Sequence, residues 1–293
     1  MDDAYTMYCL TDTIFYDSFT LKATADHDFE LAQGPVPEGW RRTPSGDWMA
    51  YTPPEPVLPR QGWKIHVSAC MDSVEEILAA TWEYCIARDI PFKFIRSKEF
   101  FFLRNTKYAA RGASGKFVTI YPADEAQLEI VLTELGAILA GQPGPYILSD
   151  LRWGAGPLYV RYGGFAERYC IGAGGELELA LEDENGVLVP DQRGTTFSVP
   201  AWVTLPEFLV PHLADRNSTT VEGLPYRIDH ALHFSNGGGV YGATHLPTGE
   251  NVVLKEARPY AGLAWDLEFR DFSGDGGAVM AGVGGAASGG LGS

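Results

Sequence analysis

Cysteine, long apolar runs and positive charge are all scarce in this sequence of 293 residues. The four cysteines are widely scattered, with no Cys-x-x-Cys pair and no close spacing typical of zinc ligands, so we expect reduced and mostly buried thiols. No apolar run approaches the roughly 20 residues of a membrane span. The acidic start Met1-Asp2-Asp3 is unlike the basic start of a secretory signal, and a cytoplasmic location is therefore expected.

The shortage of cations also limits the partners of the chain. Its formal net charge of −16 disfavours general binding to nucleic acid or to an anionic membrane, because both would be repelled. Residues 93–116 are the exception: they contain seven lysines and arginines and one acid, Glu99. An anion site is therefore expected to be local to this basic segment.

The pattern of apolar residues predicts an α+β fold. Residues 1–61 are rich in aromatics and prolines and are expected to form loops and short strands. Capping boxes at Ser73/Glu76 and Asp124/Gln127 predict two helices, which end near Pro91 and Gly141. Short strands are predicted over residues 62–69, 92–95, 117–121, 158–162 and 176–181, which favours an α+β sandwich over a doubly wound sheet.

A lysine and a histidine two residues apart are the main catalytic candidates. In the strand-like run of residues 62–69, Lys64 and His66 are expected to leave one face, about 7 Å apart along the chain, while Trp63, Ile65 and Val67 leave the other. A lysine amine can remove a proton from carbon and an imidazolium can protonate a leaving oxygen, a pairing that suits β-elimination. A core histidine beside a lysine that snorkels to solvent is the alternative for such a pair.

Further cations could hold a phosphate. Arg111 and Lys116 lie in a glycine-punctuated loop, where backbone N–H groups and two cations could surround an anion, although a solvated basic turn is the alternative. Arg152 and Arg161 lie in apolar, glycine-rich surroundings and are expected to meet an anion, since an unpaired buried arginine is costly. Arg161 is the stronger candidate because it interrupts a strand, and Arg152 could instead pair with Asp150.

The polar residues 215–220 are expected to connect to a new unit that begins near Tyr226 and carries a second motif. Gly237, Gly239 and Gly242 match Gly-x-Gly-x-x-Gly, and Lys255 ends a nearby apolar strand. The combination is typical of the nucleotide-binding start of a protein kinase. The sequence has no His-Arg-Asp loop and no Asp-Phe-Gly, because Asp271-Phe272-Ser273 does not complete it.

With residues 62–69 and 107–117, these motifs resemble a class III lanthipeptide synthetase, in which a phosphothreonine-lyase-like α/β sandwich precedes a kinase domain. The resemblance covers roughly residues 5–260. It implies a phosphoserine/phosphothreonine lyase domain over residues 1–220, an incomplete kinase N-lobe sheet over 226–260 and a disordered Gly/Ala-rich tail over 261–293. Lys64 would be the base, His66 the acid and Lys93 a phosphate ligand.

The resemblance also implies cofactors and partners. The lyase would need no cofactor, and ATP with Mg²⁺ would matter only where a complete kinase is restored. The substrate would be a phosphorylated lanthipeptide precursor, and a complementary kinase–cyclase chain would be a further partner. We expect the chain to be truncated within the kinase domain. The alternatives are a non-catalytic remnant that binds the precursor or a partner synthetase, and an ATP-dependent Ser/Thr kinase.

Overall fold

A seven-stranded antiparallel sheet forms the centre of the larger part of the protein. The computed structural model describes residues 28–192, 194–218, 225–263 and 279–283, the last as backbone only. The strand order is β1-β2-β4-β5-β3-β7-β6. In chain order these strands are β1 (Arg41–Ser45), β2 (Trp48–Thr52), β3 (Gln61–Val67), β4 (Phe92–Ile95), β5 (Val118–Ile120), β6 (Leu151–Arg152) and β7 (Leu158–Gly164).

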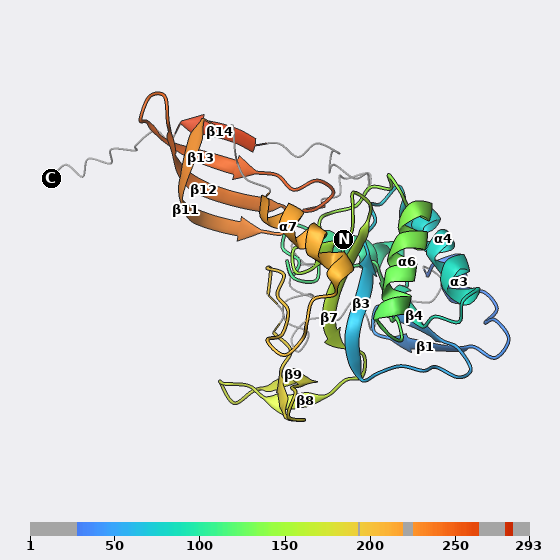
Figure 1. Ribbon diagram of the computed structural model, residues 1–293. Helices are drawn as coiled ribbons and strands as arrows, with labels where there is room; N and C mark the ends of the chain where they lie inside the picture. The colour runs from blue at the N-terminus through green and yellow to red at the C-terminus, as the bar shows by residue number, and fades with distance from the viewer. Residues whose placement is uncertain (1–27, 193, 219–224, 264–278, 284–293) are drawn as a thin grey trace.

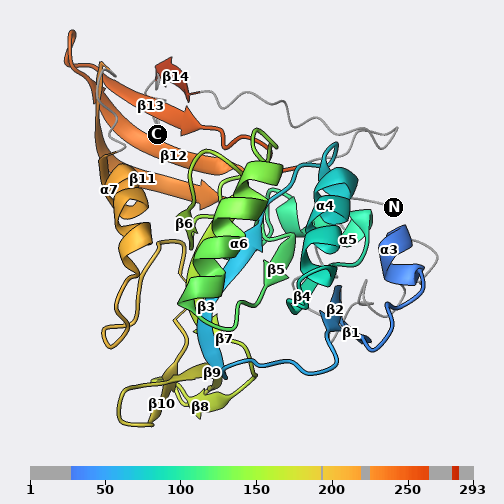
Figure 2. The ribbon, with the colours of Figure 1, turned by 45° about the vertical axis from the view of Figure 1, so that its right-hand side comes forward.

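Helices cover one face of this sheet (Figures 1 and 2). The two long ones, α4 (Val74–Ile86) and α6 (Glu125–Ile138), pack their apolar sides on the strands, and Leu128, Val131, Leu132 and Leu135 of α6 are fully buried. Ile65 and Val67 of β3 enter the same core from the sheet. Each such buried side chain stabilises the fold by about 1.5–3 kcal/mol relative to exposure. The other helical elements of the described residues are α3 (Glu30–Gln33), α5 (Lys98–Asn105), the 3-10 turn Glu207–Leu209 and α7 (Val210–Ser218).

The two predicted capping boxes have different outcomes. Asp124 caps α6 by accepting a hydrogen bond from the Gln127 N–H at 2.8 Å, and Gln127 Oε1 accepts one from the Ala123 N–H at 2.7 Å. Helix α4 forms as predicted, but its capping box is absent, because Ser73 makes no side-chain cap. Its Oγ instead accepts a hydrogen bond from the Cys70 N–H at 3.3 Å, and Glu76 accepts one from the Gln142 amide at 2.8 Å.

The described residues also form two smaller sheets. Strands β8 (Tyr169–Ile171), β9 (Leu177–Glu182) and β10 (Leu188–Pro190) form a three-stranded antiparallel sheet. Strands β11 (Tyr226–Ser235), β12 (Gly238–His245), β13 (Asn251–Glu256) and β14 (Val279–Val283) form a four-stranded one, which we call the second sheet. Figure 1 shows it as a separate layer in orange and red.

Mixed helices and antiparallel sheets confirm the α+β prediction at this level. Three details differ from it. Helix α5 was not expected, and residues 215–218, expected as a connection, form the last turn of α7. Strand β14 lies inside the expected disordered tail, while residues 264–278 and 284–293 of that tail lie outside the described residues.

Of the four cysteines, Cys70 and Cys85 are buried free thiols and Cys170 is a half-buried one, whereas Cys9 lies outside the described residues.

Candidate active site

The face of the large sheet that the helices do not cover carries a group of cations. Lys64 and His66 of β3 lie on this face, as their alternation predicts. Lys64 is opposite Arg161 of β7, and His66 is opposite Thr119 of β5. Thr119 is in turn opposite Lys93 of β4. Directly paired residues share a face, so four strands place these side chains together.

These side chains border a cavity of about 480 Å³. Its polar and aromatic lining residues are Trp48, Lys64, His66, Lys93, Arg104, Lys116, Thr119, Tyr121, Arg161, Phe165, Glu167 and Asp191. Lys64, His66 and Arg161 are each only 6–7% exposed. The cavity is therefore a concave site on a β-sheet, and its wall holds more lysines and arginines than acids. The protein as a whole is strongly acidic.

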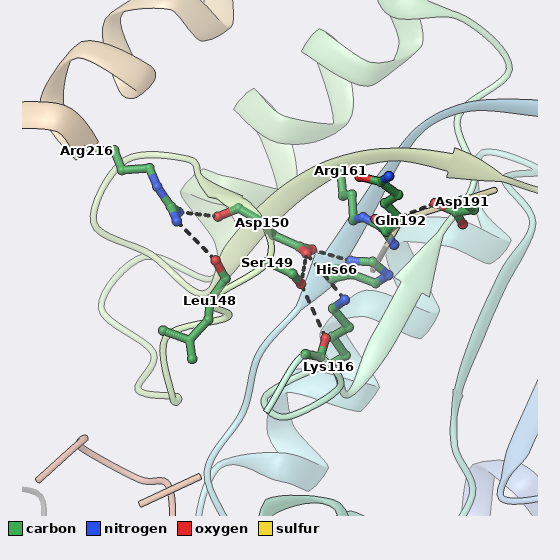
Figure 3. Close-up of polar contacts among 10 residues, drawn as sticks. His66, Lys116, Leu148, Ser149, Asp150, Arg161, Asp191, Gln192 and Arg216 are labelled. Carbon is green, nitrogen blue, oxygen red and sulfur yellow. Dashed lines mark hydrogen bonds and ion pairs between the residues drawn. The ribbon is translucent and has the colours of Figure 1, made fainter. Parts of the chain in front are cut away.

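His66 contacts Asp150, which is fully buried (Figure 3). Burial lowers the pKa of His66 to about 3, although the carboxylate of Asp150 acts in the opposite direction. His66 is therefore neutral at neutral pH. Its Nδ1–H then donates to Asp150 Oδ2, which leaves the Nε2 lone pair unprotonated.

Asp150 is held from three directions (Figure 3). Lys116 Nζ lies 3.3 Å from Oδ1, and the Ser149 hydroxyl donates to the same oxygen at 2.6 Å. Burial alone would raise the pKa of Asp150, but its contacts with His66, Lys116 and Ser149 hold that pKa below its usual range. Arg216 of α7 donates to the Asp150 main-chain carbonyl at 2.7 Å, so this helix fixes the backbone behind the carboxylate.

Arg161 lies beside a second acid, Asp191, in the same cavity as Lys64. Lys64 Nζ donates to the Gly164 carbonyl at 2.8 Å. Arg161 donates to Asp191 Oδ1 at 2.7 Å and to the Gln192 carbonyl at 3.0 Å. Arg161 therefore meets an anion, as its apolar surroundings predict.

Lys93 leaves β4 on the cavity face, while Phe92 and Phe94 enter the core. Its Nζ lies 4.5 Å from the centroid of the Trp48 ring. The same ring lies 5.0 Å from the guanidinium of Arg104, which also pairs with Asp47. Trp48 thus supports two cations at one side of the cavity.

Two of the expected phosphate ligands do not line this cavity. Arg152 donates to the carbonyls of Ala155 and Gly156 in the turn that follows it, rather than to Asp150 or another acid. Arg111 packs against the second sheet, where its guanidinium lies 4.5 Å from the centroid of the Phe234 ring. Its loop still contributes Ala110, Gly112, Ala113 and Lys116 to the cavity wall.

The glycine motif lies at the turn between β11 and β12. Gly238 and Gly239 are buried there, and Gly238 has a φ of +145°, which favours glycine. A Cβ at Gly242 would lie 2.6 Å from the ring of His230, so close packing also accounts for that glycine. Lys255, in β13, is exposed.

The sequence did not reveal the two acids of the site. The sequence suggests Asp150 only as a partner for Arg152 and gives no role to Asp191. Asp150 is 84 residues from His66 and Asp191 is 30 residues from Arg161, so only the pairing of distant segments brings them together. The signal available was weak: an acid directly before a short apolar strand, in Ser149-Asp150-Leu151.

The described residues contain neither a candidate metal cluster nor a helix that could span a membrane. There, no group of three or more His, Cys, Asp or Glu side chains is placed to hold a metal ion. Within the same ranges, no helix has the length and apolar character needed to cross a bilayer.

Comparison with known proteins identifies the class of this chain. Residues 28–219 match the family described as RamC, N-terminal domain, and the chain belongs to that family. It is also 53% identical, over 272 residues, to the probable SapB synthase of Streptomyces coelicolor (strain ATCC BAA-471 / A3(2) / M145). These matches confirm the resemblance to class III lanthipeptide synthetases. The match takes in 91% of this chain but only 29% of the length of that synthase.

Two solved structures are weakly similar to the fold. One is the type III effector/phosphothreonine lyase OspF from Shigella flexneri, with a TM-score of 0.35 and 16% identity, covering 55% of this chain and 86% of that chain. The other is described as a phosphothreonine lyase, with a TM-score of 0.34 and 14% identity, covering 55% of this chain and 82% of that chain.

Proposed function

We propose that this chain is a lyase that eliminates phosphate from phosphoserine or phosphothreonine in a lanthipeptide precursor. The observation that carries the proposal is the placement of buried Lys64 and His66 beside Lys93, Lys116 and Arg161 in one cavity. Such a site combines acid–base groups with cations that can hold a phosphate dianion. Membership of the RamC N-terminal family makes a precursor peptide the natural substrate.

In the proposed reaction, Lys64 acts on the α-proton and His66 acts on the oxygen that links Cβ to phosphorus. The unprotonated Lys64 amine removes the α-proton of the phospho-residue. The electron pair forms the Cα–Cβ double bond, and the Cβ–O bond to phosphate breaks. His66 Nε2 delivers a proton to the bridging oxygen, so that the products are a dehydrated residue, inorganic phosphate and a protonated Lys64.

The proton that His66 delivers has to arrive with the substrate. Its low pKa leaves the imidazole neutral in the empty site. A phospho-residue that binds as its monoanion carries one proton, which Nε2 can accept as the phosphate becomes a dianion. The dianion then stabilises the imidazolium, and Asp150 on the opposite nitrogen does the same.

The second sheet is proposed to be the start of a kinase N-lobe with at most a weak nucleotide-binding surface. Its antiparallel strands, the glycine-rich turn at Gly237 and Gly239, and Lys255 in β13 support this assignment. Nucleotide phosphates are normally held together with metal ions that residues of the second kinase lobe bind. We therefore expect no kinase activity from the residues of this sheet by themselves.

Mass spectrometry of a phosphoserine peptide tests the proposal against its alternatives. The purified chain, without nucleotide, should convert the peptide to a dehydroalanine product that has lost the mass of phosphoric acid. Binding of the intact precursor with no loss of phosphate would favour a non-catalytic remnant. Transfer of phosphate from ATP to an unphosphorylated precursor would favour a kinase.

A further inference from the structure

The turn of the second sheet is embedded in the loop that forms one wall of the cavity. Asn236, at the tip of the β11–β12 hairpin, is fully buried. Its main-chain N–H donates to the Lys107 carbonyl at 2.9 Å, and its side-chain amide donates to the Thr106 carbonyl at 3.0 Å. One residue of the second sheet therefore holds the first two residues of the loop 106–116.

Arg258 stabilises the contact between the hairpin tip and the loop. It is 8% exposed and donates to both the carbonyl and the side-chain oxygen of Asn236, at 2.8 and 3.0 Å. Its other terminal nitrogen donates to the Tyr146 carbonyl of the larger part at 2.6 Å. The guanidinium thus bridges the hairpin tip and the segment that leads to Asp150.

A third set of bonds passes through Asn105, where α5 ends and the loop begins. Its carbonyl accepts the N–H groups of Gly262 and Leu263, each at 2.9 Å. Its side-chain oxygen accepts from the Ser114 hydroxyl at 3.0 Å and from the Gly115 N–H at 2.8 Å. Asn105 therefore connects the segment after β13 directly to the residues beside Lys116.

We propose that Asn236 and Arg258 are positioning residues for the elimination site. They fix loop 106–116, which places Lys116 3.3 Å from Asp150 and supplies Gly112 and Ala113 to the cavity wall. The inference rests on the proposed function for its activity readout. It assigns to the second sheet a role that does not depend on nucleotide binding.

The experiment compares Asn236→Asp with Arg227→Ala in the full chain. Aspartate keeps the oxygen that accepts from Arg258 but loses the amide that donates to Thr106. The variant therefore breaks one contact to the loop and preserves the contact between the hairpin tip and Arg258. Arg227 lies in β11 and donates hydrogen bonds to Asp229 and Thr244, which belong to the second sheet. A second variant, Arg258→Lys, tests the bridge to Tyr146 independently.

Two readouts are measured: hydrogen exchange of the amides of residues 109–116, and the KM and kcat for a phosphoserine peptide. Asn236→Asp and Arg258→Lys should each speed loop exchange at least about 10-fold and raise KM about 10-fold, with a smaller change in kcat and with β3 still protected. Arg227→Ala should match the wild type.

Unchanged loop exchange in both variants would overturn the inference, as would faster exchange with wild-type KM and kcat. If the wild-type chain eliminates no phosphate, the proposed function fails, and hydrogen exchange alone then decides whether Asn236 and Arg258 position the loop.

Discussion

At the scale of single residues, the site depends on a histidine whose two nitrogens have different environments. One nitrogen contacts the buried Asp150, and the ring as a whole is taken out of water. Burial destabilises the charged imidazolium by more than the Asp150 carboxylate stabilises it, so the imidazole stays neutral. The same residue thereby gains a free lone pair at Nε2 for the substrate and becomes a source of acid sensitivity.

That sensitivity gives the first prediction. Because the pKa of His66 is about 3 in the folded state and near 6.5 when unfolded, the unfolded chain binds more protons between these values. The free energy of unfolding should therefore fall as the pH drops from 6.5 towards 4, by up to about 1.4 kcal/mol per pH unit from this residue. In His66→Asn, whose amide can still donate to Asp150, that contribution should vanish.

Denaturant unfolding at several pH values measures this effect. His233→Asn, a change on the exposed strand β11, should keep the wild-type pH dependence. An identical pH dependence in His66→Asn and the wild type would show that folding does not lower the pKa of His66.

At the scale of elements, strand β7 controls the position of the proposed base. A Cβ at Gly163 would lie 2.8 Å from Lys64 Cε and 3.1 Å from its Nζ. Because these atoms end a flexible side chain, Gly163→Ala should displace the amine while costing little stability. We expect at least a 10-fold loss of elimination with an unfolding free energy within about 1 kcal/mol of the wild type.

Gly156→Ala is the matched control, because the nearest atom to its added Cβ would be 3.8 Å away. Equal activities of the two variants in a steady-state elimination assay would contradict the close approach of β7 to Lys64.

Strand β4 offers a separate test of phosphate binding. Lys93→Ala should weaken binding of a phosphoserine peptide by about 1.5–3 kcal/mol, the range for a hydrogen bond to a charged group, and should affect the unphosphorylated peptide less. Calorimetric titration measures both. Lys98→Ala removes an exposed lysine paired with Glu75 and should leave both affinities unchanged. Equal losses for the two peptides would argue against a phosphate contact at Lys93.

At the scale of the whole molecule, the two sheets differ in how much apolar surface they bury. The large sheet is covered by α4 and α6, whereas most of β11 is exposed. Amides of β11 should therefore exchange faster than those of β3, whereas the amide of Asn236, in the turn after β11, is buried and bonded to Lys107 and should stay protected. Hydrogen exchange read by mass spectrometry checks this, and equal protection of the two strands would contradict it.

The sequence predicted features that depend on local periodicity. The alternation that places Lys64 and His66 on one face, the strand at residues 92–95 and the Asp124 cap are all present. It could not predict Asp150 or Asp191, because each pairs with a residue distant in the sequence. Two local predictions are wrong. The Ser73 hydroxyl bonds to Cys70 instead of capping α4, and Arg152 bonds to turn carbonyls instead of an anion.

The central claim is that Lys64 and His66 carry out the elimination, and the rates of their alanine variants test it most directly. On a phosphoserine peptide, Lys64→Ala and His66→Ala should each slow formation of the dehydrated product by at least about 100-fold. Arg88→Ala, which removes an exposed cation paired with Glu134, should retain the wild-type rate. A near-normal rate in Lys64→Ala or in His66→Ala would contradict the role assigned to that residue.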